Sequence, residues 1–471
     1  MTIYFYLGQN INQEAVDKIQ DSEDTFLLFE RIDVGINLFL QGKHVVEKLN
    51  GLEREGRAFS IDQDIIESFQ YRPCKFVRDQ RERIISAIFD DYKVFLLRMR
   101  YKRFDAMGAF HGLCYFSDIV DYTLGLVGEN KPKLIFCAYT PHTVEAWVVV
   151  RTLEELGARI VRLISSPLPW VMLPVQGLSN STRSRNLVAK SSSERSGGID
   201  KYLAILRGDY SLAIPFYEKN PLKKFDFQNF SGMAILRQPK KIIKLLDHYL
   251  VKSEFKRSAK LPSNKRPYAV YFLHYQPEMN TLPEADFYVD QFQAIKKISD
   301  ALPHGINLII REHPSTFSKH TDRRWRPAGF YRRLLTLPDA YICPAGLSSF
   351  DVLDNAIFVA SIAGVCLTEA LARGKPAVTF YMPRFAQFDE KLIIDANTCS
   401  VSQLREIFSK IAAGGWQISE ERLKKSLYNL MCSGYDGAKG DAFIPQSGAQ
   451  SHANSIRSTN LAIQDILDGL I

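Results

Sequence analysis

Residues 361–378, SIAGVCLTEALARGKPAV, have the types and spacing of a phosphate-binding turn. An apolar strand is predicted to end at Ser361, Gly364 permits a tight turn, and a helical pattern starts directly afterwards. A helix N-terminus presents free backbone N–H groups and a partial positive charge, which bind phosphate well. The hydroxyls of Ser361 and Thr368 add donors, and Glu369, one turn into the helix, can accept hydrogen bonds from a ribose diol. A purely structural strand–turn–helix connection is the alternative.

The stretch REHP, residues 311–314, follows a predicted strand about 50 residues earlier. A histidine at a strand end, held by the proline after it, can donate to a phosphate oxygen and stabilise a leaving nucleotide. We therefore predict a catalytic role for His313 and ligand-binding positions for Arg311 and Glu312. Arg311 and Glu312 are expected on opposite sides of the strand end. A surface-loop histidine is the alternative.

A third polar stretch, HYQPEMNT at residues 274–281, ends the first predicted strand of the same region. Gln276 and Glu278 are expected to enter the same site, because the carboxyl ends of parallel strands meet at one edge of a sheet. The alternative is a polar loop in which Pro277 fixes a turn.

The fourth candidate, TPHTVEAW at residues 140–147, lies in the N-terminal third of the chain. His142 and Glu145 are three residues apart at a predicted helix start and so share one face. They have the chemistry of an acceptor base with its orienting carboxylate, or of a nucleophile. The alternative is ordinary capping, with Thr140 or Thr143 as N-cap and a glutamate in the first turn.

Alternating strand and helix patterns position these motifs. In residues 266–381 apolar strands alternate with helical patterns, the longest at 286–303. Residues 133–166 form another strand–helix–strand unit, in which Gly157 ends the helix. Such alternation predicts parallel, doubly wound sheets that bind ligands at the carboxyl ends of their strands. The segment after about residue 433 is polar and glycine-rich and is expected to be a loop before a terminal helix.

The predicted organisation has four parts. They are an N-terminal α/β domain (1–175), a linker and helical segment (176–262), a C-terminal Rossmann-like domain (263–435), and a polar tail with a terminal helix (436–471).

Composition narrows the class of protein. The chain has 471 residues, 46% of them hydrophobic and 24% charged, which excludes intrinsic disorder and suits two domains. Its seven cysteines are dispersed without a CxxC pair, so no zinc or redox motif is expected. No secretory leader or membrane-spanning run is apparent, so we expect a cytoplasmic protein, at most peripheral at the membrane.

The net charge of +8 is partly clustered in three stretches: Arg72–Arg83, Arg98–Arg103 and Arg323–Arg333. Basic clusters that include aromatic residues suit an anionic lipid surface, and equally suit helices that extend their arginines into solvent. No recognised nucleic-acid motif is present, so nucleic acid is not an expected partner.

Taken together and in this order, HYQPE, REHP and SIAGVCLTEALARGKP resemble the bacterial capsule polysaccharide synthesis family of glycosyltransferases. The resemblance covers residues 265–390, with fainter support at 133–170. It implies the GT-B architecture of two Rossmann-like domains with a donor cleft between them. In that architecture residues 1–175 form the acceptor side and residues 263–435 bind the nucleotide sugar. Kdo transferases and sialyltransferases with similar histidine–proline motifs use CMP-linked donors. The resemblance therefore implies a CMP-linked sugar donor, a glycan or glycolipid acceptor, and neither a cofactor nor a bound metal.

By this resemblance His313 and Pro314 contact the donor's phosphate and nucleotide, Ser361, Gly364 and Glu369 bind phosphate and ribose, and Gln276 lies near the sugar. Two alternatives remain open. One is a UDP-sugar 2-epimerase, which would release a free rearranged sugar. The other is a non-catalytic capsule assembly or export protein, which would bind no donor.

Overall fold

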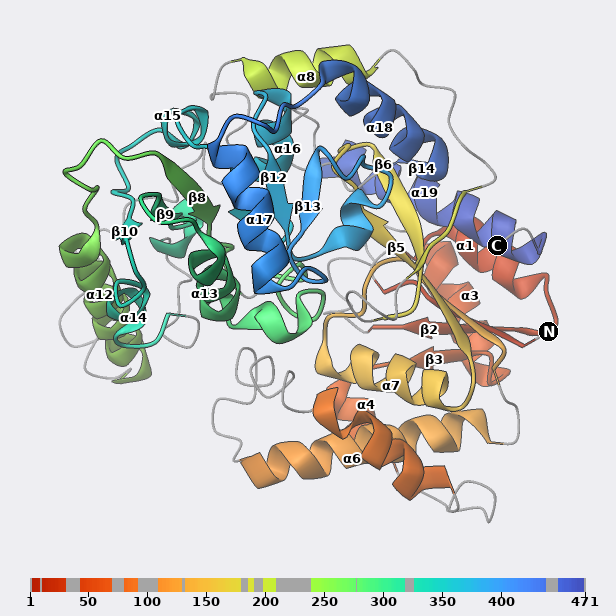
Figure 1. Cartoon of the computed structure of the whole chain (residues 1–471). Helices are drawn as coiled ribbons and strands as arrows, with labels where there is room; N and C mark the ends of the chain where they lie inside the picture. The colour runs from red at the N-terminus through yellow and green to blue at the C-terminus, as the bar shows by residue number, and fades with distance from the viewer. Residues whose placement is uncertain are drawn as a thin grey trace.

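The computed structural model describes residues 2–8, 11–30, 43–69, 80–91, 109–128, 132–178, 185–189, 198–208, 239–276, 278–317, 326–437 and 448–469. Two sheets built around parallel strands organise the molecule, and each has its own hydrophobic core (Figure 1). The expected fold class, two Rossmann-like doubly wound α/β domains, is confirmed.

The N-terminal sheet has a parallel part in the order β3-β2-β1-β4-β5. Its strands are β1 (Ile3–Tyr6), β2 (Thr25–Phe29), β3 (Ala58–Ser60), β4 (Leu134–Cys137) and β5 (Arg159–Ser165). Three antiparallel strands extend the sheet beyond β5: β6 (Val171–Gln176), β7 (Arg185–Asn186) and β14 (Tyr435–Asp436). The parallel strands are apolar on both faces because helices cover both sides.

The helices of this domain are α1 (Gln13–Gln20), α3 (Lys43–Arg54), α4 (Gln63–Ser68), α6 (Ala109–Val127), α7 (Val144–Glu155) and a helix over residues 80–91. Right-handed crossovers place α1 and α3 on one face of the sheet and the helices that precede and follow β4 on the other. The contacts agree, since α1 packs on α3, and α6 packs on α4 and α7.

The C-terminal sheet is entirely parallel, in the order β10-β9-β8-β11-β12-β13. Its strands are β8 (Tyr268–Phe272), β9 (Asn307–Arg311), β10 (Ala340–Ile342), β11 (Val359–Ser361), β12 (Ala377–Thr379) and β13 (Ile393–Asp395). Counted from β8, this is the 3-2-1-4-5-6 order of a dinucleotide-binding sheet. The strand order reverses between β8 and β11, where ligands bind in such sheets.

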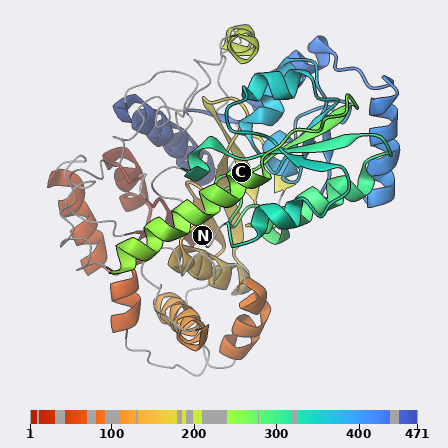
Figure 2. The same ribbon diagram turned by 90° about the vertical axis from the view of Figure 1, so that its left-hand side faces the viewer.

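The helices of the C-terminal domain are α12 (Pro239–Ser258), α13 (Gln291–Ala301), α14 (Phe330–Leu334), α15 (Ser349–Asp354), α16 (Val365–Ala372), α17 (Val401–Ala412) and α18 (Glu420–Ser433). Three short 3₁₀ turns join them: η3 (Asp286–Val289), η4 (Pro314–Phe317) and η5 (Met382–Phe385). The long helix α12 crosses the front of the molecule in Figure 2 and packs against α14.

Two segments cross between the domains. Helix α8 (Ile199–Arg207) lies outside both sheets and packs against α16 of the C-terminal domain. After α18 the chain returns to the N-terminal domain, where β14 pairs with β6 and α19 (Gly448–Leu467) packs against α1 (Figure 1).

Two predicted elements are wrong in detail, and one strand was missed. The stretch after residue 433 is not all loop, because Tyr435 and Asp436 form β14 against β6. Strand β6 itself was not predicted. The helix expected over residues 286–303 is divided, because Asp290 turns the chain out of helical geometry and caps α13 through its carboxylate.

No helix among the described residues has the length and apolarity needed to cross a membrane.

Candidate functional site

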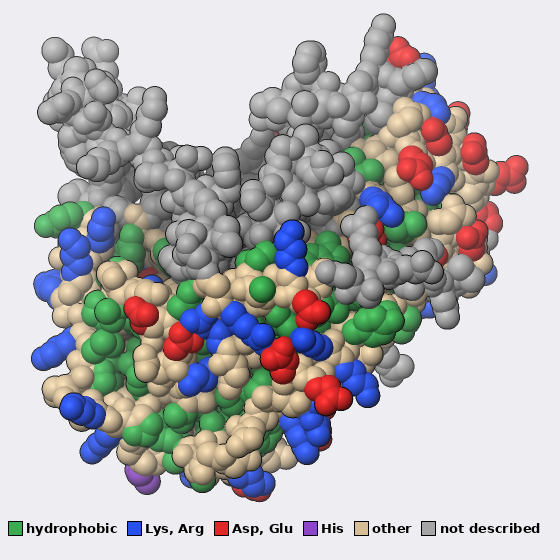
Figure 3. All heavy atoms as spheres, turned by 90° about the horizontal axis from the view of Figure 1, so that it is seen from above, with side chains coloured by type: hydrophobic (Ala, Val, Ile, Leu, Met, Phe, Trp, Pro, Cys, Tyr) green, Lys and Arg blue, Asp and Glu red, His purple; other side chains and the backbone are tan. Residues whose placement is uncertain are grey.

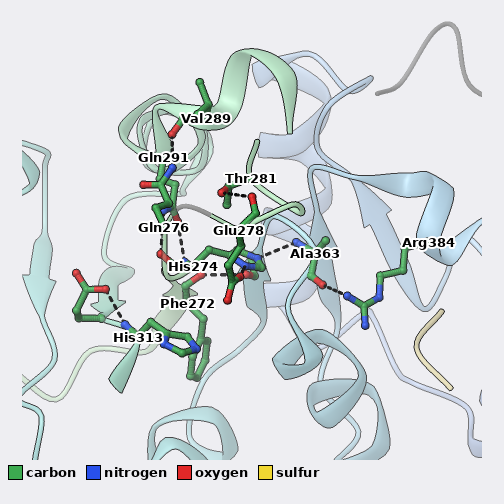
Figure 4. A network of polar contacts seen from close by, with 12 residues as sticks. Phe272, His274, Gln276, Glu278, Thr281, Val289, Gln291, His313, Ala363 and Arg384 are labelled. Atoms are coloured by element: carbon green, nitrogen blue, oxygen red, sulfur yellow. Dashed lines mark hydrogen bonds and ion pairs between the residues drawn. The ribbon is translucent and has the colours of Figure 1, made fainter. Parts of the chain in front are cut away.

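His274 lies at the point where the C-terminal sheet changes direction, two residues after β8. Its backbone N–H donates to Gln291 Oε1 (2.7 Å), and Gln291 Nε2 donates back to its carbonyl (3.0 Å). Its ring joins the loop after β8 to the turn after β11: Nε2 lies 3.1 Å from the Ala363 N–H, and Nδ1 lies 3.3 Å from Glu278 Oε2. Figure 4 shows His274 between Glu278 and Ala363. One side chain thus braces both halves of the switch point.

These contacts define the tautomer of the neutral ring. Because the Ala363 N–H donates to Nε2, that nitrogen carries no proton. The ring proton is therefore on Nδ1 and points to the Glu278 carboxylate. Glu278, which the sequence predicted to enter the site, thus orients the His274 ring. The Glu278 side chain is 33% exposed.

The turn after β11 ends in a helix N-terminus without a side-chain cap. Gly364 is the N-cap of α16 and provides no capping hydrogen bond, whereas Asp290 and Ser348 cap α13 and α15. A Cβ at Gly364 would lie 2.9 Å from Cys366 Sγ and 3.1 Å from Ser361 Oγ, so a larger residue would be crowded here. The backbone φ of −67° does not itself require a glycine. The first N–H groups of α16 are therefore suited to an anion.

The side chains of Ser361 and Thr368 face other parts of the protein. Ser361 Oγ donates to the Phe272 carbonyl at the end of β8 (2.9 Å), so it ties the two switch-point strands together. Thr368 is 1% exposed, on the side of α16 that faces the protein interior.

Glu369 is the carboxylic acid of this helix. Burial raises the pKa of its carboxyl to about 7, and the charge of Arg373 opposes that shift. Among the described residues no hydrogen bond to this carboxylate is found, so it can accept from hydroxyl groups of a ligand. Near neutral pH it is present in both protonation states.

Glu312 is the centre of a buried network beneath the loop after β9. Its Oε1 accepts from the His313 N–H (2.7 Å), Thr316 Oγ1 (2.9 Å) and Arg326 Nη2 (2.9 Å), and its Oε2 accepts from Arg326 Nε (2.7 Å) and Tyr331 Oη (2.8 Å). Burial pushes its pKa up, but Arg326 and these hydrogen bonds outweigh burial and hold the pKa below its usual value. With its lone pairs occupied, Glu312 fixes His313 and the start of η4.

The remaining C-terminal candidates also have partners inside the protein. Arg311 donates to Ser349 Oγ (3.0 Å) and to the Leu347 carbonyl (2.7 Å), away from Glu312. Gln276 donates to the Val289 carbonyl (2.8 Å) and accepts from Arg326 Nη1 (3.1 Å). Both side chains hold loops in place. Pro314 begins η4, and the His313 ring centroid lies 6.1 Å from that of Tyr275.

The N-terminal candidates lie at the start of α7, after β4. Thr143 caps this helix by accepting from the Ala146 N–H (3.2 Å), which decides which threonine is the cap. His142 Nδ1 lies 3.4 Å from the Thr140 carbonyl, and Glu145 accepts from Tyr115 Oη (2.9 Å).

A cluster of polar side chains beside these residues was not predicted from the sequence. Glu30, directly after β2, accepts from Tyr6 Oη and Thr143 Oγ1, both at 2.7 Å. Tyr139 packs edge-on against Tyr6 and lies close to His142. The ends of β1, β2 and β4 thus form a second polar cluster. Glu30 follows the apolar run Thr25–Phe29 directly, and this position after a parallel strand was the available signal.

The two domains meet through a buried polar cluster at their strand ends. Arg162 on β5 is fully buried and donates to Thr140 Oγ1 (2.5 Å), Glu284 Oε1 (3.2 Å) and Tyr381 Oη (3.2 Å). Thr140 donates to the same Glu284 oxygen (2.5 Å). Burial raises the pKa of Glu284, against the charge of Arg162. This cluster, Arg162–Thr140–Glu284–Tyr381, is called the seam below.

Arg384, on η5, is a further residue that the motifs did not indicate. Its Nη1 donates to the Ala363 carbonyl (2.7 Å), and its Nη2 donates to the Ser166 carbonyl of the N-terminal domain (3.3 Å). Figure 4 shows the bond to Ala363. Arg384 therefore connects the turn before α16 with the other domain.

A surface pocket lies at the opposite end of α16. It is lined by Arg207, Asp354, Leu371, Ala372, Arg373, Gly374, Ile418 and Glu420. Ion pairs between Arg207 and Glu420 and between Arg373 and Asp354 border it. Because it lies at the far end of the helix from Gly364, it is separate from the switch point.

The basic clusters are described only in part. Residues 71–79, 92–108 and 318–325 lie outside the described residues. Within the third cluster Arg326 is buried against Glu312, and the Arg333 guanidinium lies 3.7 Å from the Phe292 ring centroid. On the face in Figure 3 basic and acidic side chains are interspersed. Within the described residues no group of three or more His, Cys, Asp or Glu side chains is placed to hold a metal ion.

No protein-family model and no curated protein matches the chain. Solved structures similar to it include KpsC, a beta Kdo 2,7 transferase of Thermosulfurimonas dismutans, with 14% identity, 64% of this chain and 88% of that chain covered, and a TM-score of 0.27. S. aureus MnaA with UDP has 9% identity, coverage of 100% and 97%, and a TM-score of 0.26. The lipopolysaccharide outer core galactosyltransferase WaaB has 10% identity, coverage of 97% and 99%, and a TM-score of 0.26. Likeness at this level carries no information on substrate or reaction.

Proposed function

We propose that the chain is a glycosyltransferase that binds a nucleotide-activated sugar at the switch point between β8 and β11. The observation that carries this proposal is the uncapped, glycine-led N-terminus of α16, held against the end of β8 by the His274–Ala363 hydrogen bond. Its position in a sheet of dinucleotide-binding order supports a nucleotide. Its free N–H groups suit a phosphate.

The surrounding residues have matching roles in this proposal. Glu369 accepts hydrogen bonds from the ribose hydroxyls. His313, fixed through its backbone by Glu312, donates to the phosphate as the glycosidic bond breaks. The helix N-terminus and the nearby cations stabilise the leaving phosphate. We assign direct ligand contact to His313 and Glu369, and assign positioning to Arg311, Glu312 and Gln276, whose side chains are occupied within the protein.

In this proposal the polar cluster at the ends of β1, β2 and β4 binds the acceptor. His142, Glu145 and Glu30 lie at the strand ends of the other domain, and the seam brings Thr140 of that edge against Glu284 of the C-terminal domain. A base in this cluster would take the proton of the acceptor hydroxyl. The finer proposal is a CMP-linked donor of the Kdo or sialic acid type, a surface glycan or glycolipid acceptor, and attachment at the inner membrane face.

A thermal-shift series with CMP, CDP, UDP, GDP and ADP, followed by incubation with the matching nucleotide sugars, tests the proposal. A ligand that binds only the folded protein raises its melting temperature. A shift with CMP and formation of a glycoside support the full proposal. A shift with UDP and a free rearranged sugar as product indicate a 2-epimerase. No shift with any nucleotide indicates a non-catalytic assembly protein and refutes the proposal.

A further inference from the structure

The Arg384 guanidinium is held between the two domains by neutral groups. Within the described residues it donates to two backbone carbonyls, Ala363 O at 2.7 Å and Ser166 O at 3.3 Å. Its Nε is buried and has no acceptor among the described residues. Carbonyl oxygens satisfy N–H groups but leave the charge of the guanidinium uncompensated.

The charges nearby do not balance. Arg162 and Glu284, with side chains 0% and 2% exposed, pair with each other across the seam. Arg384 adds a second cation, and no carboxylate in the described part of the chain lies within 4.0 Å of it. Burial lowers the pKa of Arg384, and the charge of Glu284, which is already paired with Arg162, only opposes this shift in part. This part of the interdomain contact therefore has one positive charge in excess.

The position of this charge indicates its partner. Arg384 holds the carbonyl of Ala363, the residue immediately before the N-cap of α16, and its charge reaches Cys366 in the first turn. The positive end of the helix and the guanidinium therefore lie at the same turn. Arginine forms strong charge-assisted hydrogen bonds to phosphate oxygens.

We propose that Arg384 is a ligand of the donor's phosphate, and that the phosphate bound there joins the α16 turn to the N-terminal domain. This proposal rests on the proposed function, because it takes the phosphate of the same nucleotide as its anion. It adds a residue that no sequence motif indicated. It also makes the nucleotide part of the interdomain contact, through the bond from Arg384 to Ser166.

The test compares each nucleoside with its nucleotide by calorimetry: cytidine with CMP, and uridine with UDP. They are titrated into the wild type, Arg384→Gln, Arg384→Lys and the control Arg207→Gln. Arg207 is a matched control because its guanidinium also donates to a backbone carbonyl, from Nε to Ala372 O (2.7 Å), but at the opposite end of α16. Circular dichroism and melting temperature establish that each variant is folded.

We expect the wild type to bind the nucleotide more tightly than the nucleoside. Arg384→Gln should lose about 10- to 100-fold in nucleotide affinity, the range of a charge-assisted hydrogen bond, with unchanged nucleoside affinity. Arg384→Lys should lose less, because it keeps the charge, and it serves as the test if Arg384→Gln does not fold. Arg207→Gln should behave as the wild type.

Two results would overturn the proposal alone: nucleotide affinity that is unchanged in both Arg384 variants, or an equal loss for nucleoside and nucleotide, which would indicate a structural role. A wild type that binds neither CMP nor UDP would overturn this proposal for both nucleotides, and the absence of binding to GDP and ADP as well would overturn the proposed function with it.

Discussion

His313 and Glu369 are the candidate residues of the C-terminal domain to which we assign direct contact with a ligand. Gln276 and Glu312 form hydrogen bonds with Arg326, and Arg311 is bonded to the loop before α15. The hydrogen bonds of these side chains hold the loops around the strand ends in place. The spacing of the motifs identified the loops, but it did not distinguish residues that hold a loop from residues that face its ligand.

Replacing His313 tests the assigned catalytic role. We expect His313→Ala to lower the rate of sugar transfer by about 10²–10³-fold, the effect of losing one preorganised donor to the leaving group. Nucleotide release from the donor sugar measures the rate. His304→Ala, on an exposed loop of the same domain, is the control and should keep wild-type activity. Near-wild-type turnover in His313→Ala would remove His313 from the mechanism.

The raised pKa of Glu369 predicts a pH dependence of stability. The folded protein binds the proton of this carboxyl more tightly than the unfolded chain does, with a pKa of about 7 against 4.5. This contribution is therefore greatest at low pH and is lost as the pH rises through 7. Between pH 5.5 and 8 the wild type should lose up to about 2 kcal/mol relative to Glu369→Gln.

Urea unfolding of both proteins at the two pH values measures this difference. Glu406→Gln, which alters an exposed pair with Lys410, controls for general charge effects. Parallel stability curves for the wild type and Glu369→Gln would show that the carboxyl is not perturbed by burial.

At the scale of elements, the sequence predicted the parts that depend on local pattern. The strands of the C-terminal sheet are continuous apolar runs, and α16 follows a glycine turn, so each is apparent within about ten residues. The division at Asp290 was missed because the apolar spacing continues through residues 286–303, whereas the cap depends on one side chain. Strand β14 could not be predicted, since its two residues are strand only by pairing with β6.

Gly434, just before β14, shows how closely the returning chain fits. A Cβ there would lie 2.7 Å from the Met172 carbonyl and 2.3 Å from Val171 Cγ1, and the backbone of β6 has little freedom to move. We expect Gly434→Ala to destabilise the protein by about 1–3 kcal/mol, the usual cost of overpacking. Thermal denaturation measures it. Gly346→Ala, where a Cβ would meet nothing within 4 Å, should be nearly neutral. Equal stability of the two variants would mean that β14 is not packed as described.

At the scale of the whole molecule, the seam fixes how the domains meet. Arg162 and Glu284 are 122 residues apart, so no motif could indicate that they pair. Arg384 was missed for the same reason, since its partners Ser166 and Ala363 come from different domains. Long-range polar contacts between domains follow from the assembled fold and not from local spacing.

Glu284→Gln tests the seam. It leaves the Arg162 guanidinium buried with only neutral partners, and removal of one member of a buried ion pair typically costs about 3–5 kcal/mol. We expect a marked fall in the urea midpoint, whereas Glu406→Gln should change it little. A Glu284→Gln protein as stable as the wild type would show that the domains are held together by other contacts.

Hydrogen–deuterium exchange with and without bound nucleotide tests the central claim most directly, because it locates the ligand. The probes are CMP, UDP and GDP, each at saturating concentration. If the donor binds at the switch point, the strongest new protection should fall on residues 361–369 and 384, with weaker protection near residue 313. Protection confined to the pocket at the other end of α16, or to the N-terminal domain alone, would contradict the proposed site. Unchanged exchange with all three nucleotides would contradict the proposed function.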